Sequence, residues 1–212
     1  MLVIGARGHA LEILQVIHEA GFTQDVYFFD NVNSDAPTTL FDLYPVLRTA
    51  AQAQDCLRQD PRFIIGIGGT QLREQVSRQM QSWGGELFSA VSPSASVGTY
   101  GVSLGSGLNI MNGVLINNEV SVGEGTMLNA RATLHHNCQV GNYCEISPAA
   151  QLLGHVKVGD YSQVGAGAIV LPRVCIGKHV TIGAGAVVTR DVPDYAVAAG
   201  VPARVQRLQL PV

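Results

Sequence analysis

Two adjacent histidines, His135 and His136, have the clearest potential for proton transfer in this sequence. A neutral imidazole with an ordinary pKa of about 6.5 accepts a proton readily near neutral pH. The chemistry that the pair suggests is general-base catalysis, in which one ring removes a proton from an attacking nucleophile. The alternative, that both rings are solvated surface residues, stays open at this point. The choice depends on the element that carries them.

That element is a repeat of six residues in the second half of the chain. From Leu104 to Val188, every sixth residue is Leu, Ile or Val. Four residues after each of these comes a small or β-branched residue at nearly every repeat, and Leu108 is the larger exception. A hexapeptide period of this kind is typical of a β-solenoid.

Glycines add a longer period, because five of them recur every 18 residues: Gly105, Gly123, Gly141, Gly159 and Gly177. Three hexapeptides therefore make one coil of a triangular prism, with one short strand on each face and the aliphatic residues inside. Each glycine marks a corner, where either a side chain would crowd the turn or the backbone needs a positive φ. We expect about five coils.

The repeat places His136 at a corner of the prism. The residue lies two positions after the inward-facing Leu134, so its side chain points outward and is buried only if another subunit packs against it. Flat apolar faces favour a closed trimer, which would enclose His136 in a cleft between subunits.

The 18-residue period also predicts what stacks on this corner, since adjacent coils lie about 4.8 Å apart. Asn118 lies below His136 and Gly154 lies above it. We expect the glycine to leave an open slot for a substrate. The same period places Glu119 below Asn137 and His155 above it.

Residues 1–90 alternate between strand and helix patterns and predict a small parallel sheet with Rossmann-like winding. Strands are expected at 2–4, 26–29, 63–67 and 86–91, and helices at 10–20 and 71–81. On the first helix, Leu11, Leu14, Ile17 and His18 are expected to share one face.

The first strand and helix are joined by a glycine turn, Gly5-Ala6-Arg7-Gly8-His9. Free backbone N–H groups at such a helix start favour an anion. The alternative is a tight turn in which His9 caps the helix. Asp30, at the end of the second strand, either binds a ribose or base or caps the next turn.

Composition excludes several classes of function. The net charge of −3 and the absence of a Lys/Arg cluster argue against nucleic-acid binding. No apolar run is long enough to span a bilayer, and the strand-like start argues against a signal peptide. We therefore expect a cytoplasmic protein without membrane insertion.

The cysteines and histidines also argue against a metal site. Cys138 and Cys144 fall at the small inward position of consecutive repeats, where reduced thiols pack as small hydrophobes. His136, His155 and His179 lack the spacing of prism-type metal hydrolases. We expect no bound metal.

The ordered motifs resemble those of the bacterial nucleotide-sugar N-acetyltransferases, which are grouped with the sialic-acid O-acetyltransferase-like proteins. The likeness covers nearly the whole chain. It rests on the G-x-x-G-H turn, on Asn129 followed seven residues later by His136, and on the segments 136–141, 146–148, 153–156, 182–188 and 200–203.

The resemblance implies a Rossmann-like α/β domain at 1–90 that binds a nucleotide sugar. A left-handed parallel β-helix at 91–212, with a C-terminal tail, would form the acetyltransferase domain of a homotrimer. The implied reaction is acetyl-CoA-dependent N-acetylation of a nucleotide-linked amino-deoxysugar, for surface glycan or glycoprotein synthesis.

The same resemblance assigns roles to individual residues. His136 is the implied general base, and Asn129 lies beside the substrate. The nucleotide and the pantetheine arm of acetyl-CoA are each assigned a set of residues: Arg7, Gly8, His9 and Asp30 for the nucleotide, and Ala166 and Ala184 for the arm. We add Asn118 as a substrate-binding residue and Gly154 as a cofactor-binding residue, because both stack on His136.

The chain departs from the family pattern at three places. Asn137 stands where Asp or Glu usually follows the catalytic histidine, Glu145 stands where a histidine associated with acetyl-CoA is common, and 68–70 lacks a common nucleotide-contacting Asn. We keep Asn137 as a catalytic residue and Glu145 as a cofactor-binding residue. Our hypothesis is that Glu119, stacked beneath Asn137, supplies the missing carboxylate.

Two other functions stay open. O-acetylation of a sugar or sialic acid would use the same histidine. A prism that has lost catalysis and only binds a nucleotide sugar is the second alternative. The nucleotide, the sugar and the ring position are not determined by the sequence.

Overall fold

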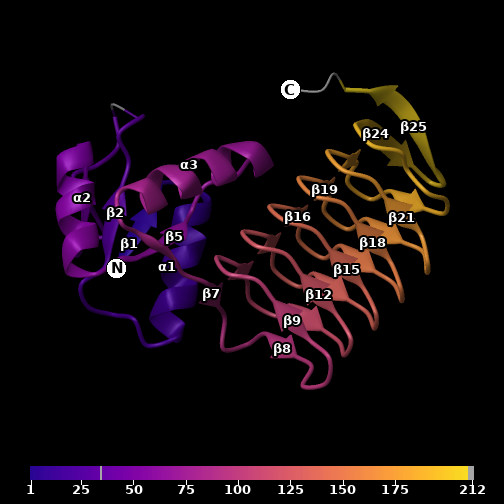
Figure 1. The fold of residues 1–212 in the computed structure, drawn as a ribbon, viewed down its shortest axis with the longest axis horizontal. Helices are drawn as coiled ribbons and strands as arrows, with labels where there is room; N and C mark the ends of the chain where they lie inside the picture. Colours follow the sequence, from indigo (N-terminus) through magenta and orange to yellow (C-terminus); the bar gives the residue numbers. More distant parts are fainter. Residues whose placement is uncertain (34, 210–212) are drawn as a thin grey trace. The chain divides into compact units, whose positions relative to one another are not determined.

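The computed structural model describes residues 1–33 and 35–209. The chain forms two compact units, Met1–Pro93 and a second unit that begins at Ser94 (Figure 1). The first unit mixes helices with a parallel sheet, and the second is built from short strands.

The first unit has one six-stranded sheet in the order β3-β4-β2-β1-β5-β6. Its pairs are parallel except for the antiparallel pair β3–β4. The elements in chain order are β1 (Leu2–Ile4), α1 (His9–Glu19), β2 (Tyr27–Phe29), β3 (Thr39–Leu40), β4 (Tyr44–Leu47), α2 (Ala50–Gln59), β5 (Arg62–Ile65), α3 (Thr70–Ser82), β6 (Glu86–Leu87) and β7 (Ala90–Val91).

The Rossmann-like prediction for this unit is confirmed, since β1 lies between β2 and β5, and helices α1, α2 and α3 precede the parallel strands β2, β5 and β6. The pair β3–β4 and helix α2 were not predicted, and the strand expected at 86–91 is two separate strands. A sequence signal for α2 exists: Thr49 and Gln52 form a reciprocal capping box at its start.

The predicted face of α1 is partly wrong. Leu14 and Ile17 are buried as expected, but Leu11 and His18 are exposed. The buried stripe continues instead through Ala10, Ile13 and Val16. Placing Leu11 on that face mistook an apolar residue at its border for one at its centre.

The second unit is the predicted left-handed β-helix, with three parallel sheets as its faces. The first face contains β10 (Asn109–Ile110), β13 (Met127–Leu128), β16 (Glu145–Ile146), β19 (Gln163–Val164), β22 (Thr181–Ile182) and β24 (Ala196–Gly200), with β25 (Ala203–Leu208) added antiparallel. The second face contains β8 (Ser96–Val97), β11 (Leu115–Ile116), β14 (Thr133–Leu134), β17 (Gln151–Leu152), β20 (Ile169–Val170) and β23 (Val187–Val188). The third face contains β9 (Ser103–Leu104), β12 (Ser121–Val122), β15 (Gln139–Val140), β18 (Lys157–Val158) and β21 (Cys175–Ile176).

The register between coils is the predicted 18 residues, as in the pair Leu134 and Leu152. Each sixth residue from Ile110 to Val188 is buried in one continuous core. Leu104 is the exception, with 39% of its surface exposed. It lies on β9, the first strand of its face, where no earlier coil covers the end of the core.

Two features of the backbone recur at the corners: crowded glycines and residues with positive φ. The predicted corner glycines have ordinary φ values, and crowding explains them: a Cβ on Gly159 would lie 2.7 Å from the backbone carbon of Gly177. Positive φ recurs at a different position, at every sixth residue from Gly101 to Gly185. Nine of these residues are not glycine, although the conformation costs about 1–2 kcal/mol each: Glu119, Arg131, Asn137, Tyr143, Ala149, His155, Tyr161, Arg173 and His179.

Three edges follow from this geometry, and each is named here after one residue. The His136 edge joins the second face to the third and contains residues 100–101, 118–119, 136–137, 154–155 and 172–173. The Tyr143 edge joins the third face to the first and contains residues 106–107, 124–125, 142–143, 160–161, 178–179 and 194–195. The Ala166 edge joins the first face to the second and contains residues 112–113, 130–131, 148–149, 166–167 and 184–185.

Candidate active site

His136 lies on the edge that bears its name, with its side chain exposed in the single chain. Its Nδ1 lies 2.9 Å from Oδ1 of Asn137. An amide oxygen only accepts hydrogen bonds, so Nδ1 carries the hydrogen and Nε2 keeps its lone pair. The neighbouring Asn137 therefore selects the tautomer in which Nε2 can accept a proton.

The His136 ring leans over the next coil. A Cβ added to Gly154 would lie 2.6 Å from both Cε1 and Nε2 of His136. Gly154 is buried, and the predicted stacking above His136 is confirmed. The expected open slot is wrong, because the imidazole itself fills the space that the missing side chain leaves.

A second imidazole packs against the first. The rings of His136 and His155 cross at 88° with their centroids 5.2 Å apart. The backbone N–H of His155 donates to the carbonyl oxygen of His136 at 3.0 Å. The sequence predicted that His155 lies above Asn137, but His155 was not among the predicted site residues.

The side chains of Asn118 and Glu119, in the coil below His136, contact the coil beneath them. Oδ1 of Asn118 accepts a hydrogen bond from the Tyr100 N–H at 3.2 Å. The Glu119 carboxylate lies over Gly101, whose added Cβ would be 2.5 Å from Oε1. Among the described residues, the Glu119 side chain has no hydrogen bond or ion pair with His136 or Asn137. Its role as the missing carboxylate stays a prediction.

The residues predicted for acetyl-CoA and substrate lie elsewhere on the prism. Ala166 and Ala184 belong to the Ala166 edge and are exposed. Asn129 follows β13 at the start of that edge and is buried, and Glu145 lies half-buried on β16 of the first face. Within one chain, the second face separates these residues from the His136 edge.

In the first unit, the glycine turn starts α1 without a side-chain cap. Gly8, with φ of 49°, is the N-cap, and His9 is the first helical residue, so the predicted capping role of His9 is wrong. Nδ1 of His9 lies 3.2 Å from the Glu12 carboxylate. Burial lowers the pKa of His9, and Glu12 opposes that effect. Arg7 pairs with Asp35 at 2.6 Å on the surface.

Asp30 caps the turn that follows β2, which is one of the two roles that were predicted for it. Its carboxylate accepts from the N–H groups of Val32 at 3.1 Å and Asn33 at 2.9 Å, and from the Asn33 amide at 2.8 Å. Burial by itself would raise the pKa of Asp30, but these donors outweigh it and hold the pKa below its usual range.

A cavity of about 240 Å³ lies beside this turn. The Asp30–Asn33 turn borders it, and an apolar row on α3, formed by Leu72, Val76 and Met80, lines another side. Such a cavity suits a flat, partly apolar group with polar atoms at one edge. Sequence reasoning missed the row, although its spacing of four residues on a helix is a visible signal.

The cysteines are free thiols in the described part of the chain, and Cys175 alone of the four is exposed. Burial raises the pKa of Cys138 to about 11, so this thiol stays protonated at neutral pH. Within residues 1–33 and 35–209, no cluster of three or more His, Cys, Asp or Glu side chains is arranged to hold a metal ion.

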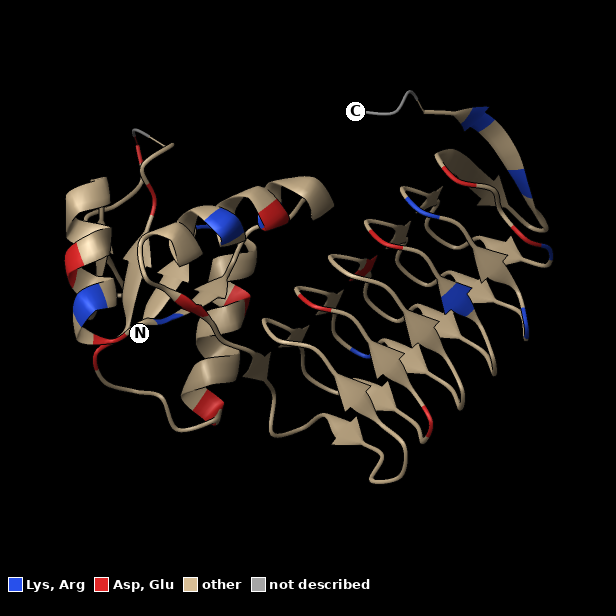
Figure 2. Cartoon of the chain, viewed as in Figure 1, with Lys and Arg blue, Asp and Glu red and all other residues tan. Residues whose placement is uncertain are grey.

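Charged residues of both signs are scattered over each unit (Figure 2). None of the helices in the described ranges combines the length and the apolar character that a membrane span requires.

Two family models match the chain. Residues 1–80 match the PglD N-terminal domain, and residues 155–190 match the bacterial transferase hexapeptide, six repeats. A search of curated proteins returned no match.

Several solved structures resemble the chain over almost its full length. A histidine-to-asparagine mutant of perosamine N-acetyltransferase from Caulobacter crescentus, in complex with CoA and GDP-perosamine, is 34% identical with a TM-score of 0.89, covering 97% of this chain and 96% of that one. The acetyltransferase domain of PglB from Neisseria gonorrhoeae, in complex with acetyl coenzyme A, is 27% identical with a TM-score of 0.88, covering 96% and 97%. WeeI from Acinetobacter baumannii, at 24% identity and a TM-score of 0.86, shares the fold over 96% and 98%. The chain belongs to the hexapeptide-repeat family of nucleotide-sugar N-acetyltransferases, which are CoA-dependent acyltransferases.

Proposed function

We propose that this chain transfers the acetyl group of acetyl-CoA to the amino group of a nucleotide-linked amino-deoxysugar, with His136 as the general base. The hydrogen bond between Nδ1 of His136 and Asn137 carries the proposal, because it leaves Nε2 as the proton acceptor. The 34% identical relative that binds CoA and GDP-perosamine supports this substrate class.

The proposed reaction needs one proton acceptor at the amine. Only an amine with a free lone pair attacks a thioester, so Nε2 of His136 takes the proton that the amine loses as the new C–N bond forms. The C–S bond then breaks, and the His136 imidazolium returns the proton to the departing thiolate. Backbone N–H groups at the corners are candidates to stabilise the oxyanion.

The acceptor's nucleotide is proposed to bind the first unit. The cavity between the Asp30–Asn33 turn and α3 suits a base. The start of α1, near Arg7, Gly8 and His9, suits phosphates because the helix dipole favours negative charge there. Asp30 would then act by shaping the turn, since its own carboxylate already accepts three hydrogen bonds.

We propose that the working enzyme is a homotrimer. His136 and the pantetheine candidates Ala166 and Ala184 lie on different edges of one prism. A second copy that places its Ala166 edge against the His136 edge would bring them together and remove His136 from bulk water. We place the enzyme in the cytoplasm, where it would serve surface glycan or glycoprotein synthesis.

A thiol-release assay across nucleotide amino sugars tests the function. GDP-perosamine is the first acceptor, followed by UDP- and dTDP-linked amino sugars and by sugars that carry a hydroxyl in place of the amine. We expect CoA release with an amino sugar and a fall of about 10²–10⁴-fold in kcat for His136→Ala. Equal rates for the variant and the native protein would contradict the role of His136.

The same assay separates the other two functions. Release with the hydroxyl sugars alone would indicate O-acetylation. A protein that binds a nucleotide sugar but shows neither acetyl-CoA binding nor CoA release would be a non-catalytic scaffold.

A further inference from the structure

His155, on the His136 edge, has an energetically unfavourable backbone conformation. Its φ of 63° lies in the left-handed region, which a residue other than glycine adopts at about 1–2 kcal/mol. The position directs the side chain outward beside His136, where the two rings cross at 88° and 5.2 Å. His136 is thereby held on three sides, by Asn137 at Nδ1, by Gly154 at its Cε1–Nε2 edge and by the His155 ring.

This contact has an electrical consequence as well as a steric one. While His155 is neutral, its ring limits rotation of the His136 side chain. When His155 takes a proton, a positive charge sits beside the ring that must itself become positive during catalysis, and like charges at this distance oppose each other. The other titratable or charged side chains on this edge, on the strands that flank it and between them are Tyr100, Glu119, His135, Lys157, Arg173 and Cys175.

We propose that His155 is a positioning residue for the acetyl transfer: its ring holds His136 in its working orientation, and a proton on His155 opposes the charge that His136 gains in catalysis. The inference rests on the proposed function for its role in catalysis. The contact between the two rings does not depend on that function.

Two substitutions at His155 distinguish the steric effect of its ring from the effect of its protonation. His155→Asn removes the ring and keeps a residue that tolerates a left-handed backbone. His155→Phe keeps a flat ring that does not titrate. We expect His155→Asn to lower kcat about tenfold with both KM values within about twofold, and His155→Phe to stay within about threefold of the native kcat at pH 8.

The pH profile gives a readout that packing alone would not change. We expect the acid limb of kcat/KM to differ between the native enzyme and His155→Phe, because the variant has no second ring that can take a proton. The matched control is His179→Asn on the Tyr143 edge, because His179 has φ of 54° and also stacks on rings, those of Tyr161 at 4.8 Å and Tyr195 at 4.9 Å. We expect its kcat and pH profile to match the native enzyme.

A titration of the histidine ring signals by NMR completes the test without any substrate. The full-length protein carries isotope-labelled histidine, and His136→Gln identifies the His136 signals. We expect the His136 titration to change in His155→Asn and to be unchanged in His179→Asn. Identical His136 titrations in native protein and His155→Asn, or equal kcat and pH profiles for the two, would overturn the proposal. Loss of the proposed function alone would instead appear as no acetyl transfer by native protein with the ring coupling intact.

Discussion

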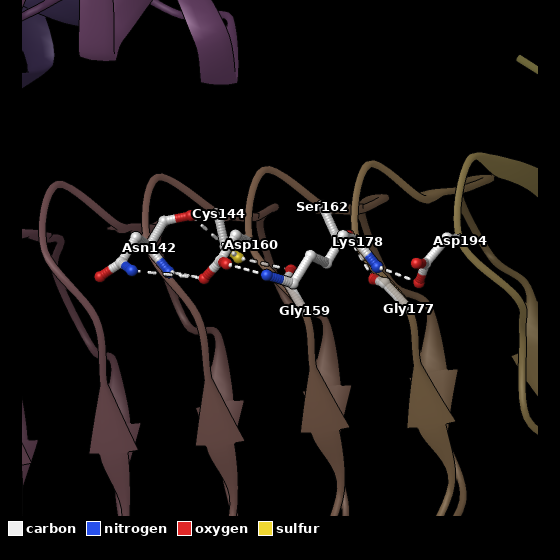
Figure 3. A network of polar contacts seen from close by, with 8 residues as sticks. All are labelled: Asn142, Cys144, Gly159, Asp160, Ser162, Gly177, Lys178 and Asp194. Atoms are coloured by element: carbon white, nitrogen blue, oxygen red, sulfur yellow. Dashed lines mark hydrogen bonds and ion pairs between the residues drawn. The ribbon is translucent and has the colours of Figure 1, made fainter. Parts of the chain in front are cut away.

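The His136 edge and the Tyr143 edge have the same backbone but use their side chains differently. On the Tyr143 edge, successive coils are tied by a polar ladder, part of which is shown in Figure 3. Asp160 accepts from the Asn142 N–H at 2.9 Å and pairs with the Lys178 ammonium at 2.9 Å, and Asp194 accepts from the Lys178 N–H at 2.8 Å. The side chains of this edge therefore bond to the coils above and below.

The same edge carries a column of stacked rings. Tyr143, Tyr161, His179 and Tyr195 stack in that order with interplanar angles of at most 16°. Beneath the surface, Ser162 donates to the carbonyl oxygen of Gly177 at 2.7 Å and accepts from the Val180 N–H at 2.9 Å. These contacts offset the cost of left-handed residues at the corners.

The His136 edge has few such ties between its side chains. Its central contact is the bond between His136 and Asn137, which runs along one coil and not between coils. Nε2 is thus left without a partner on this edge. Side-chain bonds between coils are therefore concentrated on the Tyr143 edge, and the proposed general base lies on an edge that has fewer of them.

The largest effects are expected from glycine-to-alanine substitutions at Gly154 on the His136 edge and at Gly159 directly before the Tyr143 edge. The three atoms nearest to a Cβ at Gly154 would all belong to the His136 ring. The three nearest to a Cβ at Gly159, which directly precedes the Tyr143 edge, would be backbone atoms of the next coil, the closest at 2.7 Å. We expect Gly154→Ala to lower kcat/KM about 100-fold by displacing the ring, with little change in Tm. We expect Gly159→Ala to lower the free energy of unfolding by about 1–3 kcal/mol. Kinetics and thermal melts of both variants check this.

The division between edges would fail if the two glycine variants lost activity and stability in the same proportion. It would also fail if Gly154→Ala unfolded the protein while Gly159→Ala left the melt unchanged.

A smaller effect is expected from the partner of the imidazole. Asn137→Asp puts a carboxylate at Nδ1 of His136, which favours the charged ring and raises the pKa of His136. We expect the acid limb of kcat/KM to move to higher pH, and kcat above it to rise a few-fold, by about 0.5–1 kcal/mol of barrier. The measurement is a pH–rate profile of native and variant enzyme.

Glu119→Gln is the companion variant, because Glu119 is the other candidate carboxylate on this edge. If kcat/KM of Glu119→Gln stays within about twofold of the native value, the hypothesis that Glu119 assists Asn137 is wrong. An unchanged acid limb in Asn137→Asp would show that the Nδ1 contact does not set the basicity of His136.

The smallest effect concerns the ladder. Burial by itself would raise the pKa of Asp160, but Lys178 and the Asn142 N–H outweigh it and hold the pKa below its usual range. Its stabilisation is therefore present above the ordinary pKa of about 3.9 and is lost as pH falls through the lower folded value. We expect Asp160→Asn to lose about 1 kcal/mol at pH 7 without loss of kcat.

Chemical denaturation at pH 7 and at acid pH checks the Asp160 prediction. The stability difference between native protein and Asp160→Asn should shrink as the pH is lowered. A difference that grows toward acid pH would contradict the assigned direction.

The sequence predicted the parts of the molecule that depend on periodic burial. Leu134 and its counterparts identified the prism, its register and the stacking of Gly154 on His136. The short pair β3–β4 and helix α2 were missed, because strands of two and four residues leave little periodic signal and the buried face of α2 is small, with Ala53, Cys56 and Leu57. The open slot above His136 was predicted wrongly, because side-chain orientation depends on local packing that spacing does not encode.

The site could be predicted only in part for a further reason. Ala166 and Ala184 lie on a different edge from His136, so the proposed use of all three in one reaction would need a contact between copies of the chain. The bond between His136 and Asn137 was likewise not predicted, although the departure at Asn137 was noted.

A crystal structure of the protein with CoA and GDP-perosamine tests the central claim most directly. We predict that the sugar nitrogen lies about 2.6–3.2 Å from Nε2 of His136, with a second copy of the chain enclosing that edge. A bound sugar whose amine lies beyond the reach of this ring, or a His136 edge that faces bulk water in the complex, would contradict the account.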